Sequence, residues 1–411
     1  MRNYLAVLRH TGFRRLWLGA TISSVGDGMT FVALSWLVLA QPDGTSGLGL
    51  LGVCYTAPVL VGGLLVGPVL DRFDKRVVLV VDSLLRAAAV ASVPVTSMLG
   101  GTPSWLPFAV AATYGLLKMV PLAGFPAAIP QLVAERELEA ANALESMSFS
   151  VAFVVGPALA GLLVNAAGPE VVLAVDGVSF LVFALAAATV REPLSPVITS
   201  KARRPSLAGL RRDRVIVTTT IAFMAFNIAE GMLLVTTPWL AKNHLPGGAA
   251  TLGLLLAALA AGEIAGAALA GRRQRSLVAG IAVAQAGAAL GFLGLLATPN
   301  HILVGAGFFV VGALSAPMTV WAQSLRMRRI PAELHGRAFA TLRTLMQGTP
   351  PVGTLLATPL LAGDHLALAA LTMALVAGLP AALVYANAET SGRRERSKMR
   401  KSSCYSPTNE R

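Results

Sequence analysis

The chain has 411 residues, of which 55% are hydrophobic and only 13% are charged, and its formal net charge is +13. Soluble domains normally carry about a quarter charged residues, so this composition excludes an ordinary soluble protein. The apolar residues gather in blocks of about 18 to 25, which is long enough to cross a hydrocarbon core of about 30 Å. Such blocks predict a protein that crosses a lipid bilayer repeatedly.

Twelve blocks of this kind follow one another along the chain. In the first half we expect helices at Leu16–Leu39, Leu48–Leu70, Val77–Leu99, Trp105–Val120, Ser146–Ala166 and Val171–Val190. In the second half we expect them at Val215–Leu240, Leu252–Ala270, Leu277–Ala297, Ile302–Ala322, Thr344–Ala362 and Leu366–Ala386. The fourth block is short and runs into Pro121, Pro126 and Pro130. No block alternates between apolar and polar residues with a period of two, so the predicted fold class is an all-α membrane protein of twelve transmembrane helices.

The basic residues lie almost entirely on one side of these helices. With the blocks placed as above, thirty of the 33 Lys and Arg residues fall on that side. Lys242 falls on the other side, and Arg86 and Lys118 fall inside helices. Because positive loops stay in the cytoplasm, both termini are predicted to be cytoplasmic, in a multi-pass protein of the cell inner (cytoplasmic) membrane. The asymmetry also accounts for the net charge without nucleic acid, since a nucleic-acid binder needs an exposed basic patch on a soluble fold.

Two polar segments divide the chain. Residues 191–214 contain three prolines, which argue against one continuous helix. They are predicted to be a cytoplasmic linker between a six-helix half at residues 1–190 and a second six-helix half at residues 215–386. Residues 387–411 are basic and lack apolar periodicity, so they are predicted to be a disordered cytoplasmic tail near anionic lipid headgroups.

The two halves resemble each other in sequence. When Asp27 is set against Glu230, Asp27-Gly28-Met29 lies over Glu230-Gly231-Met232. At the same register, Trp36-Leu37 lies over Trp239-Leu240. Such coincidences are rarer than chance matches between apolar segments, so we interpret the halves as parallel, pseudo-symmetric repeats. A site between the repeats near the bilayer midplane is the usual consequence.

The loop after the second helix carries the sharpest motif, Gly67-Pro68-Val69-Leu70-Asp71-Arg72-Phe73-Asp74-Lys75-Arg76. A small residue lets neighbouring helices approach, an acid can face the positive end of an adjacent helix, and basic residues stay on the cytoplasmic side. The loop resembles the cytoplasmic signature of the major facilitator superfamily, although Asp74 stands where the family usually has a second Gly. The resemblance implies the major facilitator fold and a gating motif formed by Gly67, Asp71, Arg72, Lys75 and Arg76. The matching loop of the second half, residues 271–276, has no acid.

Further stretches resemble one branch of that superfamily, the drug:proton antiporter 3 branch, which contains macrolide and enterobactin exporters. They include Ser23-Ser24-Val25-Gly26-Asp27, Asp82-Ser83-Leu84-Leu85-Arg86 and Pro331-Ala332-Glu333-Leu334-His335-Gly336-Arg337. In the fifth helix, Gly156, Pro157 and Gly161 resemble a signature of antiporters. The alternative for that stretch is an ordinary kink, because Gly and Pro let a helix bend and pack closely.

Charged residues inside the predicted helices are the remaining functional candidates, since each costs about 2.5–3.5 kcal/mol at a helix centre. Asp27 and Glu230 lie near mid-depth in helices one and seven, which face the central cavity in this family. Each is expected either to bind a proton or a cationic substrate, or to form a buried structural hydrogen bond. Glu263 in the eighth helix is a third candidate. Asp82 and Arg86, four residues apart, are predicted to form an intramembrane ion pair.

Three classes of function are compatible with these observations. The branch resemblance and the fifth helix favour a secondary active exporter of small amphipathic molecules with protons as the coupling ion. An uptake transporter of the same fold for a small metabolite is the alternative. A membrane enzyme would need clustered catalytic or metal-binding residues, and the five histidines have no ligand spacing. We therefore expect a monomer without metal or other cofactor, whose partners are a small-molecule substrate, protons and the lipid bilayer.

Overall fold

The computed structural model describes residues 2–194, 213–270, 276–330 and 335–403, and within them the chain is helical throughout its ordered elements. The first half comprises α1 (Arg2–Val7), α2 (Thr11–Leu39), α3 (Gly44–Thr56), α4 (Pro58–Arg72), α5 (Lys75–Met98), α6 (Leu106–Leu117), α7 (Met119–Leu132), η1 (Glu135–Glu137), α8 (Leu138–Ala167) and α9 (Pro169–Ala188). The second half comprises α10 (Arg214–Asn243), α11 (Ala249–Ala270), α12 (Leu277–Gly291), η3 (Phe292–Ala297), α13 (His301–Arg329), α14 (His335–Gln347), α15 (Pro350–Ala362) and α16 (Leu366–Ser403).

Eleven segments among the described residues are long and apolar enough to cross a membrane. They correspond to eleven of the twelve predicted helices. The remaining one, predicted at Thr344–Ala362, is divided between α14 and α15, each of 13 residues. The interruption falls at Gly348 and Thr349, directly before the prolines that open α15. Pro350 and Pro351 have no backbone N–H with which to continue the hydrogen bonds of α14.

Several predicted boundaries differ from the structure, two of them by more than ten residues. The fourth helix does not end at its prolines, since α7 continues from α6 as far as Leu132. Proline is tolerated inside membrane helices because neighbouring helices and local adjustments satisfy the freed backbone groups. The tail predicted to be disordered from residue 387 is instead helical as far as Ser403. A membrane helix supplies the nucleus there, and the Ala, Glu, Arg and Lys residues that follow propagate it.

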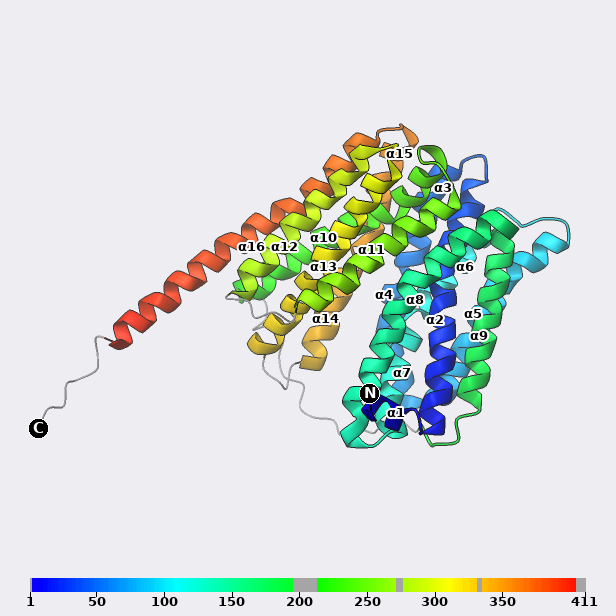
Figure 1. The fold of residues 1–411 in the computed structure, drawn as a ribbon, viewed down its shortest axis with the longest axis horizontal. Coiled ribbons are helices and arrows are strands. Elements are labelled where there is room, and N and C mark those ends of the chain that lie inside the picture. The colour runs from blue at the N-terminus through cyan, green and yellow to red at the C-terminus, as the bar shows by residue number, and fades with distance from the viewer. Residues whose placement is uncertain (1, 195–212, 271–275, 331–334, 404–411) are drawn as a thin grey trace, which may run out of the picture.

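The helices form two bundles that meet near the loops joining α2 to α3 and α15 to α16, and that separate toward the end carrying α1 and α14 (Figure 1). We call these two ends the far side and the terminal side. The packing is alike in both bundles: α2 contacts α8 and α9, while α10 contacts α15 and α16. Between the bundles, α8 packs on α11 and α3 packs on α15.

The contact between α8 and α11 is close enough to require glycine. A Cβ at Gly161 would lie 2.3 Å from the carbonyl oxygen of Ala249, and one at Gly253 would lie 2.4 Å from that of Pro157. No real Cβ atom makes such a contact, so the two backbones touch. Small residues at helix interfaces allow this approach in a membrane.

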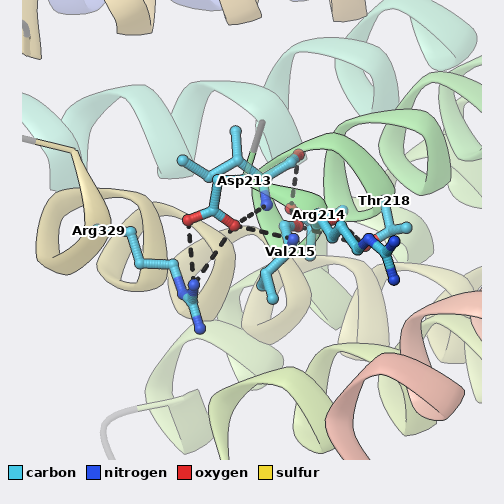
Figure 2. Close-up of polar contacts among 7 residues, drawn as sticks. Asp213, Arg214, Val215, Thr218 and Arg329 are labelled. Atoms are coloured by element: carbon cyan, nitrogen blue, oxygen red, sulfur yellow. Dashed lines mark hydrogen bonds and ion pairs between the residues drawn. The ribbon is translucent and has the colours of Figure 1, made fainter. Parts of the chain in front are cut away.

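On the terminal side, an acid fixes the start of α10 (Figure 2). The Asp213 carboxylate accepts hydrogen bonds from the backbone N–H groups of Val215 at 2.9 Å and Ile216 at 3.2 Å. The same carboxylate forms an ion pair with Arg329 at the end of α13, at 3.0 Å. Asp213 thus caps one helix and ties it to another, next to the opening between the bundles.

Candidate functional site

A cavity of about 900 Å³ lies between the two bundles. Helices α4, α7 and α8 of the first half and α10, α11, α13 and α14 of the second half contribute to its wall. Most of the lining is apolar, with Phe149, Phe153, Phe223 and Phe226 supplying aromatic rings. The cavity reaches Arg343 on α14, which is exposed. It therefore opens toward the terminal side, where the bundles diverge.

Two predicted site residues, Glu230 on α10 and Glu263 on α11, line this cavity. Both are half-buried, and the two carboxylates act on each other electrostatically. Neither carboxylate has an ion pair or a hydrogen bond to any other residue that the structure describes. Two acids without compensating cations in a largely apolar cavity attract a proton or a cationic group.

The structure places Asp27 elsewhere. Asp27 does not line this cavity, and its Oδ1 lies 2.8 Å from Nη1 of Arg86 on α5. The predicted pair of Asp82 and Arg86 is also present, with 3.4 Å between Asp82 Oδ2 and Arg86 Nε. Arg86 thus lies between two carboxylates, and Asp27 and Glu230 do not share equivalent surroundings. The sequence repeat aligns Asp27 with Glu230 but does not show that only Asp27 has a basic partner, because the second half has no counterpart of Arg86 at mid-depth.

Aromatic and polar groups enclose the Arg86 cluster. The guanidinium lies 4.8 Å from the ring centroid of Tyr114 and 5.1 Å from that of Phe180. The Tyr114 hydroxyl donates a hydrogen bond to the backbone carbonyl of Asp27 at 3.3 Å. Nearby, the Asp176 carboxylate accepts hydrogen bonds from Thr30 and Ser179. Arg86 itself is only 2% exposed, so the first bundle contains a buried guanidinium that two carboxylates compensate.

The predicted gating motif lies at the junction of α4 and α5 on the terminal side. Asp74 accepts a hydrogen bond from the backbone N–H of Arg76 at 2.8 Å and so caps α5. This explains how the loop tolerates an acid in place of the second Gly. Arg76 also donates to the backbone carbonyl of Glu192 at 2.6 Å, and the backbone N–H of Lys75 donates to that of Leu194 at 3.1 Å. The loop is thereby held against the start of the linker.

Asp71, Arg72 and Gly67 of the motif make no close contact across the helices among the described residues. Asp71 and Arg72 are exposed, and no described residue forms an ion pair with Asp71. A Cβ at Gly67 would meet nothing within 4 Å. The close helix approach expected at Gly67 is therefore not made while the terminal side is open.

The helix-five motif lies where α8 meets its neighbours. A Cβ at Gly156 would lie 2.6 Å from the carbonyl oxygen of Val25 on α2, and Gly161 contacts the start of α11. Pro157 lies inside α8, and its carbonyl oxygen touches Gly253 of the other bundle. The motif thus packs α8 against both its own bundle and the opposite one.

Sequence reasoning missed Arg326. Arg326 lies outside the predicted tenth helix, which ends at Ala322, whereas α13 continues to Arg329. The side chain is 4% exposed and belongs to the cavity wall. Its only signal in the sequence is its position one turn beyond an apolar block.

Two helical bundles enclose a cavity that two acids line, and comparison with known proteins assigns this architecture to a membrane transporter. The family described as transmembrane secretion effector matches residues 3–406. The chain belongs to this family of the major facilitator superfamily.

Relatives and solved structures are consistent with that assignment. The multidrug efflux pump Tap of Mycolicibacterium fortuitum is 27% identical over 86% of this chain and 90% of its own length. Macrolide efflux protein A of Streptococcus pyogenes is 20% identical over 84% and 88%. Among solved structures, the peptide transporter POT superposes with a TM-score of 0.76 over 93% of this chain and 95% of that chain, at 14% identity. That likeness shows the fold alone.

Proposed function

We propose that the protein is a proton-coupled exporter of small amphipathic molecules that works by alternating access. The observation that carries the proposal is the pair of uncompensated carboxylates, Glu230 and Glu263, in a large apolar cavity between two bundles. The names of the efflux relatives support export over uptake. The apolar and aromatic lining supports an amphipathic substrate.

The coupling follows from the cost of charge in this setting. An ionised carboxylate at mid-membrane is unfavourable unless a proton, a cation or a basic side chain compensates it. A proton and a cationic substrate group therefore compete for Glu230 and Glu263. Protonation from outside releases the substrate there, and substrate binding from inside releases the proton, so each facing of the cavity favours one occupant. In the first bundle, we assign Asp27 a coupling role that depends on release from Arg86.

Uphill transport in everted membrane vesicles tests this proposal. We expect export of a lipophilic dye such as ethidium to stop on addition of a protonophore. Glu230→Gln and Glu263→Gln, singly and combined, should remove the dependence of transport on the pH gradient. Glu170→Gln, at the start of α9 and outside the cavity, is the matched control and should behave as the wild type. Protonophore-resistant export with an unchanged pH dependence in the double variant would contradict proton coupling.

We also propose that the terminal side faces the cytoplasm, so this conformation faces inward. The basic residues of the loops support that orientation. Impermeant thiol labelling of a variant lacking Cys54 and Cys404 tests it. A single cysteine at Gly101 or Gly363 should react from outside intact cells, and one at Ser200 should not. Labelling at Ser200 from outside would reverse the topology.

A further inference from the structure

The wall of the cavity contains a buried arginine that has no acidic partner among the described residues. Arg326 is 4% exposed, and no described carboxylate lies within ion-pair distance of it. Its Nη2 donates only to the thioether of Met346 at 3.4 Å, and its guanidinium lies 5.1 Å from the ring centroid of Phe223. Its Nε has no hydrogen-bond partner. A thioether is a weak acceptor, so the charge is held in place mainly by packing.

A buried charge left in this state normally costs several kcal/mol. Arg86, the other arginine buried to the same degree in the described residues, has two carboxylates beside it. Arg326 has none among the residues that the structure describes, and it lines a cavity that a solute can enter. The contrast indicates that the partner of Arg326 is supplied by the bound solute.

The position of Arg326 relative to the two acids defines the shape of that solute. Phe223, on which the guanidinium lies, is seven residues from Glu230 on α10. Seven residues are two helical turns, which places the two positions on one face and about 10 Å apart along the axis. Apolar wall lies between them, including Phe226. The cavity is therefore negative at its inner end, positive toward its mouth and apolar between.

We propose that the substrate is amphoteric: an amphipathic molecule whose cationic amine lies against Glu230 and Glu263 and whose anionic group binds Arg326. This rests on the proposed function only in that the substrate occupies this cavity. A carboxylate or another planar anion suits the fork of a guanidinium, which can donate two parallel hydrogen bonds to it. A purely cationic amphiphile leaves Arg326 uncompensated, so it should bind more weakly.

Two dyes that differ in one group test the proposal. Tetramethylrhodamine carries both a cationic xanthene and a free carboxylate, whereas its methyl ester carries only the cation. We expect purified protein in detergent to bind the free acid about tenfold more tightly than the ester, measured by fluorescence anisotropy, because one charge-assisted hydrogen-bond pair is lost in the ester. Equal affinities, or tighter binding of the ester, would overturn the proposal. This comparison needs only the wild-type protein.

Variants then assign the preference to Arg326. Arg326→Gln should weaken binding of the free acid about tenfold and leave the ester within about twofold. Arg326→Lys, which keeps the charge but loses the fork, should fall between them. Arg328→Gln is the matched control, because Arg328 is exposed on the same helix and lies outside the cavity wall. Equal losses for both dyes in Arg326→Gln would show that the arginine only supports the fold.

Transport of the same two dyes separates this inference from the proposed function. A preference for the free acid in binding, without uphill transport of either dye, would refute the exporter and leave the amphoteric site standing. Uphill export of both dyes with equal affinity would refute the amphoteric site and leave the exporter standing.

Discussion

The two bundles of this protein treat their intramembrane charges in opposite ways. In the first bundle, Arg86 lies between Asp27 and Asp82 and is enclosed by aromatic rings. In the second, Glu230 and Glu263 face an open cavity without a basic partner among the described residues. A charge that is neutralised within the protein stabilises a fixed arrangement of helices, whereas an uncompensated charge is free to bind what enters. The comparison suggests that the first bundle is the stiffer half and that the second bundle recognises the substrate.

The largest effect is expected for Arg86→Gln, which leaves the buried Asp82 and the half-buried Asp27 without the cation that they share. Removing one partner of a buried ion pair typically costs about 3–5 kcal/mol, so the free energy of unfolding in detergent should fall by about that amount. Combining it with Asp27→Asn should recover part of the loss, because the two sites share one interaction. Glu230→Gln should leave stability unchanged or higher. Equal stability of Arg86→Gln and the wild type would remove the distinction between the bundles.

The second largest effect is expected for uphill transport by the Asp27→Asn variant. We expect this change to abolish uphill export while substrate binding and equilibrative exchange persist, because the coupling charge is lost but the cavity wall is intact. Glu230→Gln should have a similar or milder effect on uphill export. Assays in proteoliposomes measure uphill export and equilibrative exchange separately, and so distinguish a loss of coupling from a loss of substrate binding. If Asp27→Asn retains full export with an unchanged dependence on external pH, Asp27 is only a structural partner of Arg86.

A smaller effect is expected at the loop acid that only the first half possesses. Asp71 is exposed here, and we propose that it forms a contact when the terminal side closes, with Arg337 or Arg343 as the predicted partners. Loss of one charge-assisted hydrogen bond costs about 1.5–3 kcal/mol, so Asp71→Asn should leave expression intact and weaken transport.

In Asp71→Asn, a cysteine placed at Ala267 in the cavity wall should react faster with a thiol reagent added from the terminal side than the same cysteine in the wild-type background. Asp43→Asn, an exposed acid on the opposite side, is the control. Unchanged transport and unchanged reactivity in Asp71→Asn would reduce the motif to a topological signal.

The smallest effect is expected for Tyr114→Phe, which removes one hydrogen bond at the edge of the Arg86 cluster. We expect a loss of about 0.5–1.5 kcal/mol in the free energy of unfolding. Tyr385→Phe, at a side chain that is 48% exposed on α16, should change nothing measurable. A loss at Tyr114 as large as that at Arg86 would mean that the ion pairs are not the main support of the cluster.

Much of the fold could be predicted from the sequence because each membrane helix satisfies its own backbone, so its apolar block is visible locally. The interruption between α14 and α15 and the helical extension of α16 were less visible, because they depend on local backbone choices next to proline and on propagation from a neighbouring helix. The candidate site was harder. Asp27 and Arg86 are 59 residues apart, and their pairing depends on the rotation of two helices, which periodicity does not fix. Arg326 was hidden for a similar reason, since the end of an apolar block does not show where a long side chain goes.

The glycine contact between α8 and α11 makes this conformation sensitive to the size of the side chain at Gly161 and Gly253. Gly161 and Gly253 touch the opposite backbone in this conformation, in which the far side is shut. A methyl group at either position therefore raises the free energy of this facing. Under the proposed alternating access, the contact between α8 and α11 opens in the opposite facing, and the clash is removed there. Gly161→Ala should therefore destabilise this conformation relative to the opposite one, and each kcal/mol of clash shifts the ratio of the two conformers about fivefold toward the opposite one. Gly161, which allows the bundles to pack together on the far side, is thus a position at which a substitution could change the populations of the two conformers without any ligand.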